Sequence, residues 1–462
     1  MNQTELKILR KIKPCKIERE IIEEFADKLL KIAKEVSKPF YAYPQIVGSI
    51  SKDTWLSGDH DIDLFIIFRK KISREKLEEY GLLIGTTICE KLNGSYNIKY
   101  AEHPYVRCKI SKGCAERRKR LSFFDFEIDI VPCYEVKRGD KIISAVDRSP
   151  HHAKYIKENL TGYRVDHARL LKYFCKQAGI YGADAKRNGL SGYLCELLII
   201  NYGTFENTLK EISKLNFGAC IDIENIADEK EAKRKFKDAL IVIDPIDKNR
   251  NVSASLSAQN FLKFKIEAAR YLKTKKFPIQ KKIMKNLLIE KLKDNRGTSF
   301  IGVKFKPPEI IIENLYPQMR KFARRLARYL EENNFSVIRY FSWTDEAEKA
   351  FIIFELENKN LSKFKKQEGP SIFSKEADNF LAKYLLSKYK PYIEENKFFV
   401  DVKRKFLNID TAIKHFLKEN REEIPKKIAE KKIKIFDEEE IIEEVNRNRE
   451  LNSYLVKKYF EI

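Results

Sequence analysis

The stretch that decides the fold is residues 48–68, GSISKDTWLSGDHDIDLFIIF. Three aspartates, Asp59, Asp61 and Asp63, occupy alternate positions directly before a run of large apolar residues. Successive side chains of a β-strand point to opposite faces, so this pattern predicts a strand that carries its acids on one face and continues into the core. Like charges on one face repel each other, and a chain with a formal net charge of +23 therefore needs a chemical reason to place them there.

A second stretch repeats this pattern at residues 124–136, FDFEIDIVPCYEV. Asp125, Glu127 and Asp129 alternate before another apolar run, which predicts a second strand with a column of acids. Two such columns side by side are unfavourable unless cations lie between them. Magnesium favours a few carboxylates plus phosphate oxygens, and two ions about 3.5–4 Å apart can hold the attacking and leaving oxygens of a phosphoryl transfer. The alternative is an exposed sheet edge protected by its charges.

The Gly48-Ser49 pair favours the phosphoryl-transfer interpretation. It follows the apolar residues Ile46 and Val47, and we expect its backbone N–H groups and its hydroxyl to face an anion. Lys52 lies about one helical turn further on and adds a cation that can reach the same phosphates. A Gly-Ser pair alone says little, but its combination with Asp-x-Asp and a third strand acid predicts a metal-dependent nucleotide site.

The composition describes a folded and strongly basic protein. Its 462 residues allow about three domains, and 43% hydrophobic with 34% charged residues fits a soluble globular chain. Lys and Arg total 91 against 68 for Asp and Glu, an excess typical of a polyanionic partner such as nucleic acid. A solubility coat and a thermophile surface are the other interpretations of this excess.

The cysteines and the apolar runs set expectations for the cellular setting. All eight cysteines lie in the first half of the chain and none forms a Cys-x-x-Cys pair, so we expect neither a zinc site nor a disulfide framework. The first 14 residues lack the apolar core of a signal peptide, and no apolar run approaches the ~18 residues that a membrane span needs. These patterns predict a protein of the reducing cytoplasm.

Hydrophobic periodicity predicts an α+β protein of several domains. The first part of the chain should combine amphipathic helices in the first 40 residues and at 73–92 with strands at 43–49, 61–68, 96–110 and 124–136. Helices dominate to about residue 275, and α+β patterning resumes at 298–356. Residues 361–371 are expected to be a linker, and the remainder is expected to be helical around 397–409.

Two groups of basic residues are candidates for contact with RNA. The first group lies in a predicted exposed hairpin loop and comprises Lys112, Arg117, Arg118, Lys119 and Arg120. The second places Arg320, Arg324 and Arg328 at four-residue spacing on a predicted helix, with Lys321 and Arg325 beside them. Charge clusters are most often solvated surfaces, but for the helical stripe we favour contact with backbone phosphates.

Together these features resemble one known family. Gly-Ser, then an acid-x-acid strand, then a third acid on a neighbouring strand is the pattern of the polymerase-beta-like nucleotidyltransferase superfamily. Further segments look like the archaeal, class I CCA-adding enzymes, among them YAEHPYV, EIDIVPCY, SAVDRSPHHAKYI, GLSGYLCELLI, VIDPIDKNRNVSASLS and RGTSFIGVKFKPP. The resemblance, which runs from about residue 45 to 370, implies a catalytic head at 1–152, a helical nucleotide-selecting neck at 153–275, an α+β body that binds tRNA at 276–370 and a helical tail that binds tRNA at 371–462.

The resemblance implies an activity as well as a fold. Its members add C, C and A to the 3′ end of tRNA from CTP and ATP without a nucleic-acid template, release pyrophosphate and repair damaged CCA ends. Mg²⁺ is the implied cofactor, and tRNA, CTP and ATP are the implied partners. We expect no association with a membrane, and the formation of a homodimer is left open. Two alternatives remain, a poly(A) or oligoadenylate-type nucleotidyltransferase that shares the head and a non-catalytic RNA-binding protein.

Roles for individual residues follow from the same resemblance. Asp61, Asp63 and Asp129 match the catalytic, metal-binding acids, whereas Asp59 and Glu127 fall outside the pattern. The positions that match nucleotide contacts are Ser49, Lys52, His152, Lys172, Tyr181 and Arg250, the last of them near the incoming base. The chain departs from the family at Lys52, where Arg is usual, and His151 is an alternative to His152. Glu102 and His103 either contact base or primer or serve the core.

Overall fold

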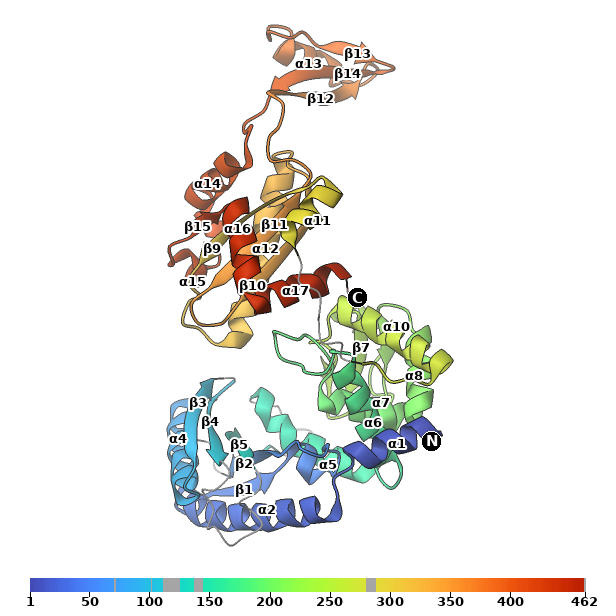
Figure 1. The fold of residues 1–462 in the computed structure, drawn as a ribbon, viewed down its shortest axis with the longest axis vertical. Coiled ribbons are helices and arrows are strands. Elements are labelled where there is room, and N and C mark those ends of the chain that lie inside the picture. The colour runs from blue at the N-terminus through green and yellow to red at the C-terminus, as the bar shows by residue number, and fades with distance from the viewer. Residues whose placement is uncertain (70–71, 101, 111–124, 137–143, 280–287, 461–462) are drawn as a thin grey trace. The chain divides into compact units, whose positions relative to one another are not determined.

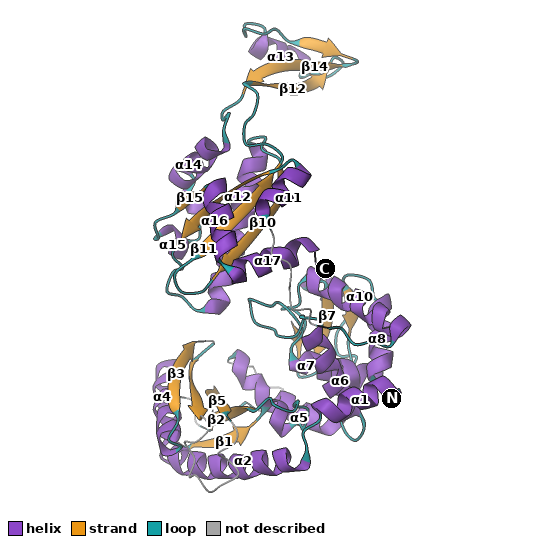
Figure 2. Ribbon diagram, viewed as in Figure 1, coloured by secondary structure: helices purple, strands orange, loops and turns teal. Residues whose placement is uncertain are grey.

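The computed structural model describes residues 1–69, 72–100, 102–110, 125–136, 144–279 and 288–460. It divides into two compact units, Met1–Lys281 and Lys282–Ile462, each with its own cores (Figure 1). Both units combine helices with sheets, which confirms the predicted α+β fold class (Figure 2). The predicted basic loop with Lys112 and its four neighbouring cations lies outside the described residues.

A five-stranded sheet forms the head of the first unit. Its order is β1 (Ala42–Ile46), β2 (Asp61–Phe68), β5 (Phe126–Tyr134), β4 (Pro104–Ile110) and β3 (Ser95–Tyr100). β2 and β5 pair in parallel, whereas the other neighbours are antiparallel. The two predicted acid-bearing strands are thus confirmed and adjacent. The predicted strand at 96–110 is instead two strands, β3 and β4, which pair with each other.

Alternation along β2 decides which face of the sheet carries the acids. The even-numbered residues of Leu64–Phe68 pack in the main core with α2 (Lys16–Ser37) and α4 (Arg74–Lys91). Phe65 and Ile67 pack in a separate small core on the opposite face. This core includes Val47, directly before α3 (Gly48–Ser51), and Ala153 of α5 (Ser149–Asn159). Asp61 and Asp63 share the parity of Phe65 and Ile67, so they belong to the face that α3 and α5 cover.

The predicted N-terminal helical region is two helices. α1 (Gln3–Ile12) ends before Pro14, and α2 begins at Lys16. Proline has no N–H for a helix interior, which explains the break. α2 covers the head sheet, whereas Leu9 and Ile12 of α1 pack in the core of the following helical region.

That helical region, the neck, completes the first unit. Its helices after α5 are α6 (Arg164–Gln177), α7 (Gly192–Tyr202), α8 (Phe205–Lys214), α9 (Glu229–Lys235) and α10 (Ala258–Thr274). A small sheet of β6 (Ala219–Ile221), β7 (Leu240–Asp244) and β8 (Asp247–Asn251) interrupts them. β7 and β8 form a β-hairpin, since they pair antiparallel. α7 is apolar along most of its length and lies in the middle of the core, with Leu194, Leu197 and Leu198 fully buried.

The body of the second unit is a four-stranded sheet between two layers of helices. Its strands are β10 (Val337–Thr344), β11 (Ala350–Leu356), β9 (Ser299–Phe305) and β15 (Lys434–Phe436), in that order. One face packs on α12 (Ile312–Glu332) and α14 (Ile409–Glu419), and the other on α16 (Glu438–Arg447) and α17 (Arg449–Phe460). The short helices α11 (Ile289–Arg296) and α15 (Lys426–Ala429) complete it. β9 and β15, which are separated by 128 residues in the chain, thus share one sheet.

Two predictions for the end of the chain were wrong. Residues 361–371, expected as a linker, contain β12 (Phe364–Ser371), and residues 397–403, expected near helices, form β14 (Lys397–Lys403). β12 pairs with β14, β14 pairs with β13 (Tyr392–Glu394), and α13 (Ala377–Tyr384) packs on β12. Phe398 and Val400 are buried and alternate with the more exposed Lys397, Phe399 and Asp401, a strand pattern that the adjacent Phe399 and the flanking lysines obscured. The expected boundary at 370 falls within β12, whose partner strand lies beyond it.

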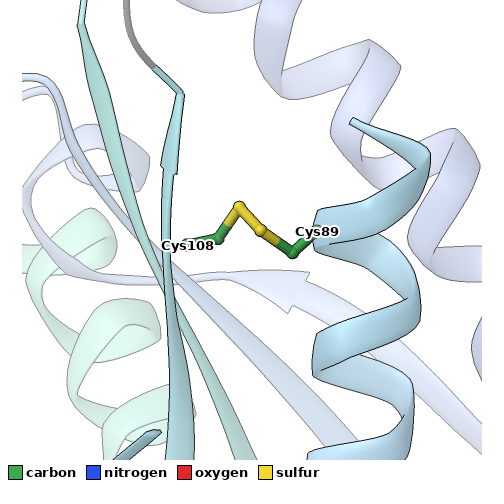
Figure 3. Close-up of a disulfide and its surroundings, with 2 residues drawn as sticks. All are labelled: Cys89 and Cys108. Atoms are coloured by element: carbon green, nitrogen blue, oxygen red, sulfur yellow. A yellow bond between two sulfur atoms is a disulfide. The ribbon is translucent and has the colours of Figure 1, made fainter. Parts of the chain in front are cut away.

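The head contains a disulfide, although the cysteine spacing led us to expect no disulfide framework. Cys89 of α4 and Cys108 of β4 form a disulfide in the core of the head (Figure 3). The two cysteines are 19 residues apart on a helix and a strand, so their spacing gives no motif, and only the packing of α4 on β4 brings them together.

Within the described ranges, no helix combines the length and the apolar character that crossing a bilayer requires.

Candidate active site

The Gly-Ser turn meets the acids of β2 and β5 at one place on the sheet. In the parallel pair, Asp63 lies opposite Asp129 and Asp61 lies opposite Glu127. Gly48 has a φ of +69°, a conformation that glycine adopts without strain. A Cβ at this position would lie 1.8 Å from Oδ2 of Asp63, so only a glycine lets the turn approach that carboxylate. The turn, the Asp-x-Asp strand and the third acid are therefore neighbours.

The acids differ in their partners. Three of them form salt bridges, namely Asp129 with Arg107 at 2.6 Å, Glu127 with Lys109 at 2.5 Å and Asp59 with Lys176 at 2.5 Å. In the part of the chain that the structure describes, no hydrogen bond or ion pair reaches the carboxylates of Asp61 and Asp63. The two acids of the Asp-x-Asp motif therefore lack the cationic partner that their neighbours have.

Burial and mutual repulsion make these two carboxylates hard to ionise. Burial, followed by the charge of Asp129, raises the pKa of Asp63 to about 6. Burial and the charges of Asp59 and Glu127 also raise the pKa of Asp61. A cation bound between the strands would stabilise the charged form of both groups.

The donor set fits a divalent metal ion. Carboxylate oxygens on adjacent strands, open to a substrate phosphate, are the ligands that Mg²⁺ prefers. As the side chains stand, no three His, Cys, Asp or Glu groups of the described residues are close enough to hold a metal. The guanidinium of Arg107 donates two hydrogen bonds, at 2.6 Å and 2.7 Å, to the two oxygens of Asp129, so this carboxylate is already paired. Among the described residues, the carboxylates of Asp61 and Asp63 are free of such a partner and can bind a metal, whereas Asp129 can do so only when its salt bridge with Arg107 breaks.

Lys52 and Lys172 share one buried carboxylate. Glu196 of α7 accepts hydrogen bonds from Lys52 at 2.6 Å and from Lys172 at 2.7 Å, and its side chain is wholly buried. The hydroxyl of Thr54 donates to Glu196 and accepts from Lys172. Although burial opposes ionisation, the charges of Lys172 and Lys52 lower the pKa of Glu196 to about 2. Two lysines on one carboxylate leave an excess positive charge, and Lys52 acts electrostatically on Asp63.

His152 and Arg250 share a second buried carboxylate. Asp244, the last residue of β7, accepts from His152 at 2.9 Å and from Arg250 at 2.7 Å. Tyr193 donates to the same carboxylate at 3.1 Å, and its ring stacks on His152 with a centroid distance of 4.1 Å. His151 instead bonds the carbonyl of Val136 at 2.6 Å, so only His152 joins this cluster. Burial lowers the pKa of His152.

Tyr181 and Ser49 lie at the edges of the lysine network. Tyr181 is half-buried, and a Cβ on Gly192 would meet its hydroxyl at 3.0 Å and the Nζ of Lys172 at 3.5 Å. The absence of a side chain at Gly192 therefore leaves room for both groups. The carbonyl of Ser49 accepts from the backbone N–H of Thr54 at 3.0 Å, which ties the Gly-Ser turn to the network.

Glu102 and His103 lie apart from these two clusters. His103 is buried, with its Nδ1 3.5 Å from Glu78 and its ring edge-on to Tyr134. The side chain of Glu102 is exposed, and its carbonyl accepts from Arg74 at 2.7 Å. The packing of His103 is that of a core residue.

The cationic stripe of the second unit is only partly exposed. Arg324 and Arg328 of α12 are exposed, whereas Arg320 is half-buried and burial lowers its pKa. Arg325 forms a salt bridge with Glu423 at 3.1 Å. Arg324 and Arg328 are thus the arginines of this stripe that are best placed for an external phosphate.

Three residues of the site were not predicted from the sequence, namely Glu196, Asp244 and Arg107. Glu196 is the lone acid of the apolar run YLCELLII, and Asp244 ends the apolar run LIVID. A single carboxylate in such a run is buried and must be paired, which is a signal that the sequence does contain. Arg107 carries no such signal, because its partner depends on the register of β4 and β5.

The fold and the site define a class of enzyme. A mixed sheet with a Gly-Ser turn against an Asp-x-Asp strand and a third acid is that of a nucleotidyltransferase, and residues 26–152 match the model of the nucleotidyltransferase domain. Residues 166–279 match the tRNA nucleotidyltransferase second domain, and residues 296–440 match the CCA-adding enzyme C-terminal domain. The chain belongs to the CCA-adding enzyme family.

Full-length relatives support this assignment. The CCA-adding enzyme of Methanocaldococcus jannaschii is 36% identical over 443 residues, which covers 93% of this chain and 94% of the relative. That of Archaeoglobus fulgidus is 34% identical over 393 residues and covers 83% of each chain. A solved structure of the Cid1 poly(U) polymerase covers 60% of this chain and 94% of its own at 13% identity, with a TM-score of 0.44. That likeness is too distant to bear on function.

Proposed function

We propose that this chain adds C, C and A to the 3′ end of tRNA from CTP and ATP, with Asp61, Asp63 and Asp129 as the acids beside the reacting phosphate. The observation that carries the proposal is the close approach of Gly48 to Asp63, opposite Asp129. It brings a turn suited to anions against acids on two paired strands. The choice of substrates is supported by relatives that are named CCA-adding enzymes.

The phosphate groups would be held by residues of the head and the neck. Ser49 and the N–H groups of its turn would face the triphosphate, and Lys52 and Lys172 would supply the positive charge that offsets the charge of the phosphates. The 3′-hydroxyl oxygen of the tRNA loses its proton and bonds to the α-phosphorus, while the bond from that phosphorus to the β-phosphate oxygen breaks and pyrophosphate leaves. Positioning and charge neutralisation provide most of the acceleration in such a transfer.

Mg²⁺ is the metal that we propose for Asp61 and Asp63, with Asp129 joining them when it leaves Arg107. When bound, the ion neutralises phosphate charge and lowers the pKa of the attacking hydroxyl. Arg107 holds Asp129 in place until then, and the charge of Arg107 offsets part of the repulsion that Asp129 exerts on Asp63.

The remaining assignments follow the expected division of the chain. Residues 1–152 would catalyse, and 153–275 would select the nucleotide through Tyr181 and Arg250, together with His152 at the end of the preceding segment. Residues 276–370 and 371–462 would bind tRNA. Arg324 and Arg328 are exposed on α12, which supports contact with the RNA backbone.

The test uses the full chain with tRNA that lacks its CCA end, CTP, ATP and Mg²⁺, and measures product length and sequence. Addition of three nucleotides in the order C, C, A supports the proposal. Open-ended A tails would contradict it in favour of a poly(A)-type enzyme, and binding of tRNA without any incorporation would indicate an RNA-binding protein.

A further inference from the structure

Asp244 joins three different parts of the first unit. It is wholly buried, and its carboxylate accepts four hydrogen bonds. Oδ2 accepts from His152 of α5 and Arg250 of β8, and Oδ1 accepts from Tyr193 of α7 and from the backbone N–H of Ile246. Although burial opposes ionisation, the hydrogen bonds from His152 and Arg250 and the charge of Arg250 lower the pKa of Asp244 to about 2. The group is therefore charged at every working pH.

A charged Asp244 fixes the proton of His152. An ionised carboxylate only accepts hydrogen bonds, so Nε2 of His152 carries the hydrogen that faces it. Burial lowers the pKa of His152, which favours the neutral ring and leaves Nδ1 as an acceptor. Stacking on Tyr193 holds the plane of this ring.

The same carboxylate fixes the orientation of Arg250. Nη1 of Arg250 donates to Asp244 at 2.7 Å and lies 3.4 Å from Nε2 of His152. About a third of the Arg250 side chain is exposed, with a relative exposure of 35%, so the rest of the guanidinium can donate outward. Asp247 at the start of β8 pairs with Arg148 at 2.9 Å, which fixes this hairpin to the start of α5.

We propose that Asp244 is a positioning residue that determines the choice between cytosine and adenine by holding Arg250 and His152 in one arrangement. The inference rests on the function proposed above and extends it to the selection of the base. Cytosine offers a carbonyl and a ring nitrogen as adjacent acceptors beside its amino group, whereas adenine offers ring nitrogens and an amino group but no carbonyl. A guanidinium and an imidazole acceptor fixed relative to each other can distinguish these edges, and mobile ones cannot.

Glu196 provides the contrast. It holds Lys52 and Lys172, which we assign to the triphosphate, a part that CTP and ATP share. Loosening Glu196 should therefore weaken both nucleotides alike, whereas loosening Asp244 should change their ratio.

The experiment compares Asp244→Asn with Glu196→Gln in the full chain. For each variant, kcat/KM is measured for CTP and for ATP on tRNA lacking CCA, where C is correct, and on tRNA ending in CC, where A is correct. For D244N we expect the ratio of correct to incorrect incorporation to fall by about 10- to 100-fold, the discrimination that one good bidentate base contact provides. For E196Q we expect both nucleotides to weaken with the ratio unchanged within about threefold.

Two further variants separate positioning from stability. Tyr193→Phe removes one donor to Asp244 but keeps the ring, and we expect a smaller fall in the same ratio. This variant tests the proposal even if D244N does not fold. Adding D244N to Arg250→Gln should cause no further loss of selection if Asp244 acts through Arg250. Equal losses for C and A in both D244N and Y193F would overturn the inference. Wild-type chain that fails to add CCA would instead refute the proposed function itself.

Discussion

Replacing Gly48 by alanine should inactivate the enzyme while leaving it folded. The new Cβ would lie 1.8 Å from Oδ2 and 2.8 Å from Cγ of Asp63, so the carboxylate must move by about 1.5–2 Å to reach ordinary contact distances. Misplacement of a reacting group by about 1 Å can cost on the order of 100-fold in rate. The backbone at a φ of +69° adds strain of about 1–2 kcal/mol, because alanine rarely adopts it. We therefore expect kcat for CTP incorporation to fall at least ~100-fold with only a modest loss of stability.

Gly179→Ala is the matched control for this variant. Gly179 has a φ of +70°, but a Cβ there meets nothing within 4 Å, so the substitution brings the same backbone strain without the clash. Both variants are compared by single-turnover CTP incorporation into tRNA lacking CCA and by urea unfolding. The reasoning is refuted if G48A retains more than about a third of wild-type activity, or if G179A loses as much activity as G48A.

Three other predictions concern charge and covalent structure. The native pKa of Asp63, about 6, exceeds its unfolded value, so the protonated group stabilises the native state at low pH and this contribution is lost as pH rises from about 4 to about 6. The variant Asp63→Asn should therefore have a higher Tm than wild type at pH 8 but not at pH 4. An equal Tm of the variant and the wild type at both pH values would contradict this expectation. Arg324→Gln with Arg328→Gln should reduce the slope of log Kd for tRNA against log salt by about 2, whereas Arg325→Gln, whose guanidinium is already paired with Glu423, should leave it nearly unchanged. Reduction of Cys89–Cys108, which closes a short loop, should lower the free energy of unfolding by about 3 kcal/mol, and a Cys89→Ala/Cys108→Ala variant should not respond to the reductant.

The sequence predicted the acid-bearing strands because their alternation is local. Asp61, Asp63 and Asp129 lie where period-2 patterning places them, and the parallel pairing of β2 with β5 then sets Asp63 opposite Asp129. Asp59 was expected on the same strand face, but β2 begins at Asp61 and Asp59 pairs with Lys176 instead. Strand ends depend on tertiary contacts that the pattern does not contain.

What the sequence did not predict are the groups that hold these side chains. Lys172 was expected only as a nucleotide contact, yet it is buried on Glu196, 24 residues away in the chain. Arg250 reaches Asp244 because β7 and β8 form a hairpin, and His152 reaches it across 92 residues. Such pairings follow from packing between helices and strands, which neither spacing nor composition encodes.

We propose that acids from β2 and β5 and the Gly48-Ser49 turn form one site for a metal-bound nucleotide. The most direct test of this proposal is a crystal structure of the chain with CTP and Mn²⁺, with the metal located by anomalous scattering. We expect Mn²⁺ bound to Asp61 and Asp63, phosphates on the Gly-Ser turn, and Asp129 released from Arg107 to the metal. Mn²⁺ bound elsewhere, or a triphosphate away from this turn, would contradict the proposal.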